Sequence, residues 1–135
     1  MNRRNMTTRR PGILTVLTIL MAINAIIAGV HYALIYLDVI PIRGDVARVT
    51  EFALADTVVT IVPSLIAAYG LWQLRPWAWA LTMMLSGGYL HGMVALLTEA
   101  AMASQFSAMS LVSVYFLLFS IVLLVCLWRQ RRLFF

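Results

Sequence analysis

Three ionisable side chains, His31, Asp56 and His91, lie inside long apolar stretches of this chain. Ionisable groups are costly in hydrocarbon, and where they occur they pair with one another, hold a metal or cofactor, or carry protons. Two imidazoles can ligate a haem iron axially, whereas imidazole nitrogen with thioether sulfur suits copper. The three residues are therefore candidates for a site, if the surrounding elements bring them together.

Their spacing from the ends of the apolar stretches predicts a common depth. At about 1.5 Å per residue, His31, Asp56 and His91 lie roughly 8 to 12 Å below the boundary set by the flanking acidic residues. Asn24 and Asp38 each stand seven residues from His31, so these three residues form one stripe that should face protein. We expect His31, Asp56 and His91 to point inward and to share hydrogen bonds, directly or through water.

Several kinds of site are compatible with this arrangement. In one, His31 and His91 ligate haem b axially and Asp56 orients one imidazole ring. In another, His31 and His91 bind copper or zinc, with Met84, one heptad before His91, as an extra ligand. In a third, Asp56 couples proton or cation movement and Pro63 supplies a hinge. The leading interpretation is simpler, because buried polar groups also serve to fix helix register.

The composition indicates that membrane-spanning helices position these residues. Of 135 residues, 63% are hydrophobic and only 11% are charged, and the mean hydropathy is +0.93. Such a chain has too little polar surface for a soluble globule. Four stretches are long enough to cross roughly 30 Å of hydrocarbon. These predicted spans cover residues 13–38, 51–74, 77–98 and 105–128.

The predicted fold is all-α, a single membrane domain over residues 1–135. The segment between the second and third spans is so short that they must be antiparallel neighbours, and the turn TEAAMASQ, residues 98–105, joins the third span to the fourth in the same way. A longer connection, VIPIRGDVARVT, follows the first span. We therefore predict an up-down-up-down four-helix bundle with the first and third spans on a diagonal.

The placement of the arginines predicts the topology. All ten cations are arginine, and eight lie on the side that would hold both termini. By the positive-inside rule that side is cytoplasmic, which gives a multi-pass protein of the inner (plasma) membrane with both termini in the cytoplasm. The net charge of +5 is spread over short segments beside the spans, so attraction to anionic lipid is expected and nucleic-acid binding is not.

Small and polar residues indicate where helices pack. Gly88 and Gly92 form a GxxxG pair, a pattern that allows two membrane helices to approach closely. Asn24 and Thr60 are further candidate packing residues, and Pro63 should kink the second span.

The hairpin GLWQLRPWAWAL, residues 70–81, carries a resemblance to a known group. Together with LWRQRRLF near the end of the chain, it resembles small bacterial four-span membrane proteins of unknown function. This resemblance implies a four-span fold and brings no activity with it.

Catalysis is not expected. The sequence has no nucleophile with a base beside it, no glycine-rich phosphate loop, and little chain outside the spans to form a substrate cleft. The sequence is therefore interpreted as a non-enzymatic integral membrane protein, an accessory or assembling subunit that contacts the bilayer and either other membrane chains or further copies of itself. The alternative is a haem, metal, proton or cation site at His31, Asp56 and His91.

Overall fold

The computed structural model describes residues 11–37, 39, 51, 54–102, 104 and 108–135, and this part of the chain is helical without strands. The π-helical turn is labelled η1 and the short 3-10 helix η2. In chain order the elements are α1 (Gly12–Tyr36), η1 (Thr57–Ile61), α3 (Val62–Trp72), α4 (Pro76–Met102), α5 (Ala108–Arg129) and η2 (Arg131–Leu133).

Within the described residues, four helices are long and apolar enough to cross a membrane, as the sequence predicted. They cover Gly12–Tyr36, Leu54–Trp72, Pro76–Met102 and Ser110–Arg129. One predicted boundary is wrong, because α4 continues through residues 99–102, which were expected to form a turn. Those residues, Glu-Ala-Ala-Met, all favour helix and include no Gly or Pro to end it. The connection after the first span and the N-terminal arginines lie outside the described residues.

A π-helical turn precedes Pro63 in the second span, where the sequence predicts a kink; the kink itself stays a prediction. The N–H of Val62 bonds to the carbonyl of Thr57, five residues back. Proline has no N–H to give, and its ring clashes with the carbonyl four residues earlier. Widening the turn over Thr57–Ile61, just before Pro63, relieves that clash. Asp56 is the residue at which the π turn begins.

A tight turn at Gln73–Arg75 joins α3 to α4. The N–H of Arg75 bonds to the carbonyl of Gly70 at 2.9 Å, and that of Leu74 to Leu71 at 3.1 Å, which is the Schellman pattern of helix termination. Leu74 takes the left-handed conformation that this pattern requires, with φ of 55°. The returning helix then passes so close to Gly70 that a Cβ there would lie 2.5 Å from that of Ala78.

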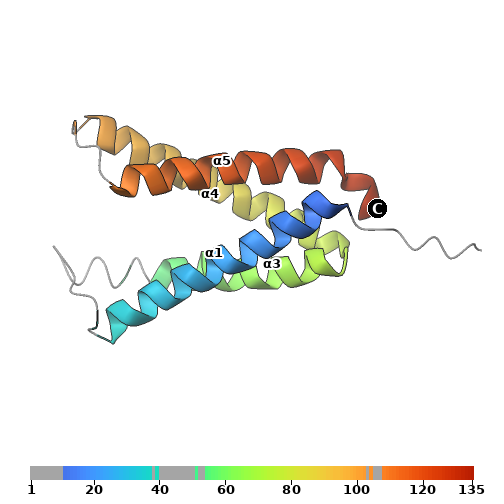
Figure 1. Ribbon diagram of the computed structural model, residues 1–135, viewed down its shortest axis with the longest axis horizontal. Helices are drawn as coiled ribbons and strands as arrows, with labels where there is room; N and C mark the ends of the chain where they lie inside the picture. The colour runs from blue at the N-terminus through green and yellow to red at the C-terminus, as the bar shows by residue number, and fades with distance from the viewer. Residues whose placement is uncertain (1–10, 38, 40–50, 52–53, 103, 105–107) are drawn as a thin grey trace, which may run out of the picture.

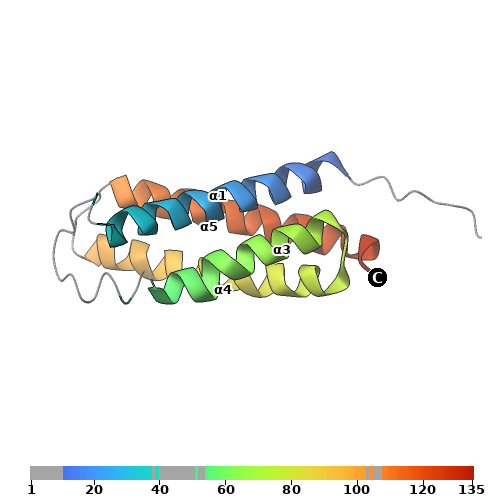
Figure 2. The same cartoon turned by 90° about the horizontal axis from the view of Figure 1, so that it is seen from below.

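The four helices form two pairs. α1 packs against α3, α4 packs against α5, and α3 packs against α4, whereas α1 meets α5 over a much shorter stretch. Figure 1 shows the pairs converging where α1 begins, α3 turns into α4 and the chain ends, and diverging toward the other end. In Figure 2 α1 and α5 lie over one side of the bundle and α3 and α4 over the other. We call the end where the pairs converge the closed end and the end where they diverge the open end.

The hydrophobic core fills the closed end. Its members are Leu14, Leu17, Met21, Ala67, Leu71, Ala78, Leu123, Cys126, Leu127 and Phe134. The end of the chain takes part, because η2 turns Phe134 back into this core and sets Phe135 edge-on against Trp79 at 5.6 Å. Trp79 also donates a hydrogen bond of 3.1 Å from Nε1 to the carbonyl of Leu127. By contrast, no residue of α4 after Ser86 is buried.

The GxxxG pair does not pack against another helix of the chain. A Cβ built on Gly88 or Gly92 would meet no atom within 4 Å, so the close helix contact that this motif predicts is not formed in the single chain. The close approach occurs instead at Gly70 and Ala78, because the short turn forces α3 and α4 together there. Thr60 is half-buried within the π turn.

Candidate functional site

The structure does not bring His31, Asp56 and His91 together. Asp56 is half-buried, whereas His31 on α1 and His91 on α4 are exposed. The expectation that both imidazoles point inward is therefore wrong for the single chain. The ring of His31 contacts that of its own neighbour Tyr32, with centroids 5.9 Å apart.

The inward stripe of α1 explains the position of His31. The buried residues of α1 are Leu14, Leu17, Thr18, Met21, Ala25 and Ile35. His31 belongs to the heptad of Leu17 and Asn24, which lies at one edge of this stripe and drifts by about 20° per heptad. Leu17 is buried, Asn24 is half-buried and His31 is exposed. The heptad of Thr18 and Ala25 leads instead to Tyr32, which is half-buried.

On α4, His91 also lies outside the inward-facing positions. Its buried residues Ala78, Thr82 and Ser86 lead at helical spacing to Tyr89, which is half-buried. His91 follows two residues later, about 200° around the helix, and so lies on the opposite side. At both places a tyrosine occupies the inward position expected of the histidine.

Asp56 is bound by Tyr32 instead. The Tyr32 hydroxyl donates a hydrogen bond of 3.0 Å to Oδ2 of Asp56, in a partly buried position. Tyr32 comes from α1, and Asp56 stands at the start of the π turn. A tyrosine hydroxyl can satisfy a carboxylate as well as an imidazole does. Sequence reasoning missed Tyr32, although its place in the heptads of α1 marks it as inward-facing.

Tyr89 of α4 faces both neighbouring helices. Its ring stacks on Phe116 of α5 with centroids 6.0 Å apart, and its hydroxyl is directed toward Ser64 of α3. The buried hydroxyl oxygen of Ser64 has no hydrogen-bond partner within the described residues. Tyr89 therefore connects α4 to both neighbours.

A second polar contact lies between α1 and α5. The Tyr115 hydroxyl is 3.1 Å from Nδ2 and 3.3 Å from Oδ1 of Asn24. The Tyr115 ring also packs on Phe116 and Phe119. Asn24, one of the predicted packing residues, thus contacts a neighbouring helix.

The chemistry that this arrangement offers is limited to one carboxylate beside phenolic and aliphatic hydroxyl groups. Within the described segments, no three His, Cys, Asp or Glu residues gather where they could hold a metal ion. Met84, the extra ligand of the copper or zinc hypothesis, has a side chain that is 75% exposed. The haem and metal hypotheses therefore gain no support from the geometry of the single chain.

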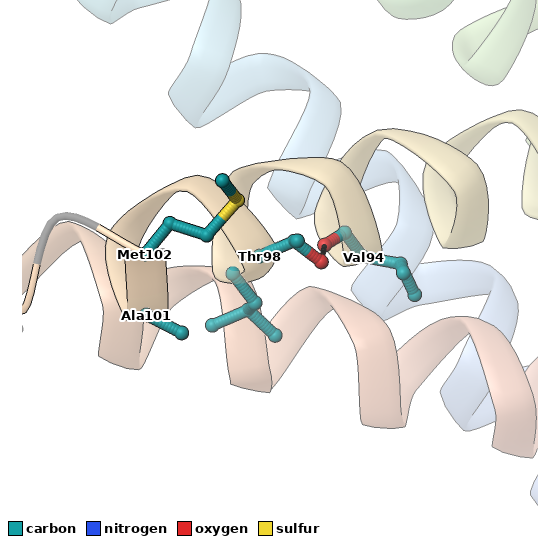
Figure 3. Close-up of a pocket in the computed structure, with 5 residues that line it drawn as sticks. Val94, Thr98, Ala101 and Met102 are labelled. Carbon is teal, nitrogen blue, oxygen red and sulfur yellow. Dashed lines mark hydrogen bonds between the residues drawn. The ribbon is translucent and has the colours of Figure 1, made fainter.

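The most unusual surface is the side of α4 that carries His91. The exposed residues on it follow a strict heptad spacing, and we call them the α4 seam: Met84, Gly87, His91, Val94, Thr98 and Ala101. A shallow hollow of about 520 Å³ lies along the last turns of α4, beside Val94, Thr98 and Ala101 of the seam (Figure 3). The Thr98 hydroxyl beside this hollow bonds to the carbonyl of Val94 at 2.8 Å. What remains exposed there is apolar.

Comparison with family models, with characterised proteins and with solved structures yields no match to this chain.

Proposed function

We propose that this chain is a non-enzymatic, multi-pass protein of the bacterial inner membrane that acts as an assembling subunit. Its helices would run up-down-up-down with both termini in the cytoplasm, and the α4 seam would receive a transmembrane helix of another membrane protein chain. The observation that carries the proposal is that α4 continues for four turns beyond Ser86 without a buried residue.

The composition of the α4 seam supports this role. Lipid is as apolar as leucine, so helices associate in membranes through small residues that allow close contact and through interhelical hydrogen bonds. The seam offers Gly87 and Ala101 as small residues and His91 as a hydrogen-bonding group. Its spacing of three and four residues suits the packing of a second helix.

The strongest energetic argument for a partner helix on the α4 seam comes from His91. An imidazole in the hydrocarbon region is unfavourable unless it meets another polar group or water. In the single chain His91 is exposed on the side of α4 away from Tyr89, where lipid would surround it. A helix packed on the seam would remove this exposure and provide a hydrogen-bond partner.

The resemblance of the Gly70–Leu81 hairpin to small bacterial four-span proteins agrees with this proposal. The charge of the closed end agrees as well, because Arg75, Arg129, Arg131 and Arg132 all lie there. Arginines beside the spans orient membrane proteins with that side in the cytoplasm.

Cross-linking in native membranes tests the proposed assembly. Single cysteines would be introduced at Gly87 and Val94 in a Cys126→Ser background, with Leu118 of α5 as a matched exposed control, and each would be labelled with a benzophenone maleimide. We expect illumination to cross-link the two seam variants to another chain and not the Leu118 variant. Mass spectrometry of the product distinguishes a second copy from a different protein. Equal cross-linking at all three positions, or none, would contradict the proposal.

A second candidate function is proton or cation movement through Asp56. It is favoured by the hydrogen bond from Tyr32 to a partly buried carboxylate beside a π turn, since π turns often occur at functional sites. The test is ion flux into liposomes that contain the purified protein. Flux lost in Asp56→Asn and kept in His31→Ala would support this function, whereas flux unchanged in Asp56→Asn would exclude it.

A further inference from the structure

An apolar groove lies at the closed end, between the start of α1 and the last turns of α5. It has a volume of about 300 Å³. Ile13 forms one wall, and Ile121, Val122 and Val125 form the other. All four side chains are aliphatic, so the groove suits an alkyl chain.

The groove ends in two polar residues, Arg129 and Gln130. Arg129 is exposed, and no acidic residue in the described segments pairs with it. Its neighbour Arg131 is engaged differently, because its guanidinium lies 4.8 Å from the centre of the Trp128 ring. Arg129 is therefore the cation that remains available at the mouth of the groove.

The surrounding charge specifies an anion. Arg75, Arg129, Arg131 and Arg132 lie at the closed end, whereas the described acidic residues, Glu51, Asp56 and Glu99, lie toward the open end. A ligand here must combine an alkyl chain with a negative charge. Among the components of a bilayer, an anionic phospholipid has both.

We propose that this groove binds one molecule of an anionic phospholipid such as phosphatidylglycerol. An acyl chain lies along Ile13, Ile121 and Val125, and the phosphate accepts hydrogen bonds from Arg129. This inference rests on the membrane insertion given under the proposed function and is independent of assembly through the α4 seam.

Lipid retention in native mass spectrometry tests the contribution of Arg129. The delipidated full chain would be titrated with phosphatidylglycerol and with phosphatidylcholine of the same acyl chains. We expect one molecule of phosphatidylglycerol per chain, and binding about fivefold weaker in Arg129→Gln. The matched control, Arg132→Gln, makes the same charge change outside the groove and should retain the lipid. Equal losses in the two variants would show diffuse electrostatic attraction and would overturn the proposal.

Two further variants test the rest of the groove. Val125→Trp fills it and should abolish retention, whereas Val112→Trp, at an exposed position of α5 outside the groove, should not. Retention that survives Val125→Trp, or equal binding of phosphatidylglycerol and phosphatidylcholine by the parent chain, would contradict the assigned contacts.

Alkaline extraction of membranes separates this inference from the proposed function. A chain released by sodium carbonate is not integral, and both proposals would fail. A chain that stays in the membrane and prefers phosphatidylcholine or neither lipid would overturn the lipid site alone.

Discussion

The hydroxyl of Tyr32 lies 3.0 Å from Oδ2 of Asp56 and donates a hydrogen bond to it. This contact joins α1 to the start of the π turn. It also supplies a polar partner to the carboxyl group of Asp56, in a helix apolar enough to span a membrane.

Breaking this contact should produce a measurable coupling. Tyr32→Phe and Asp56→Leu would each change the free energy of unfolding in detergent. The double variant should show a coupling of about 0.5 to 1.5 kcal/mol, the range found for hydrogen bonds between membrane helices. Unfolding by sodium dodecyl sulfate, followed by circular dichroism, measures it. Strictly additive effects would mean that the two side chains do not interact.

Gly70 should tolerate no larger side chain. A Cβ at this position would lie 2.5 Å from Cβ of Ala78, so Gly70→Leu must push α3 and α4 apart at the closed end. We expect the free energy of unfolding to fall by about 1 to 3 kcal/mol, because overpacking strains a filled core. Gly87→Leu is the control, since no atom lies within 4 Å of its Cβ. A monomer equally destabilised by both substitutions would contradict the packing described.

Phe134 should contribute far more to the free energy of unfolding than its neighbour Phe135. The first is 4% exposed and belongs to the core, whereas the second is 81% exposed. Phe134→Ala should lower the free energy of unfolding by about 2 to 4 kcal/mol, somewhat less than a fully enclosed phenylalanine. Phe135→Ala should cost less than about 1 kcal/mol, the value of its edge contact with Trp79. Thermal unfolding in detergent compares them, and similar losses would show that the chain end is not docked.

The two histidines should be dispensable for folding of the single chain. Both are exposed, so His31→Ala and His91→Ala should each change the free energy of unfolding by less than about 0.5 kcal/mol. They should differ in assembly, because only His91 lies on the α4 seam. Loss of cross-linking in His91→Ala, with cross-linking kept in His31→Ala, is the expected pattern. Strong destabilisation by either substitution would place an imidazole in the core.

The number, type and approximate ends of the membrane helices could be predicted from sequence because they depend on apolar length and local propensity. A kink at Pro63 stays a prediction, although a π turn does precede the proline. The rotation of each helix could not be predicted. The heptad of Asn24 and His31 looks like an inward stripe, and its member Leu17 is buried, but it lies at the edge of the packed face and leaves that face before His31.

The site residues were harder to predict than the fold. Sequence reasoning selected histidines because they ionise, whereas the structure brings Tyr32 to Asp56. It selected Gly88 and Gly92 because they fit a motif, whereas the short turn places Gly70 at the close contact. It treated residues 129–135 as a tail, and Phe134 nevertheless completes the core. Each of these depends on contacts between residues far apart in the chain.

The convergence of the helix pairs toward the closed end has a mechanical consequence. From Ala78, which faces Gly70, α4 continues for 24 residues to Met102, about 36 Å, so a tilt of roughly 5° about that contact would shift its far end by about 3 Å. A change in the angle between the pairs would therefore be largest at the open end. The sideways pressure of the surrounding acyl chains, which varies with bilayer thickness and curvature, would set how widely the pairs stand apart.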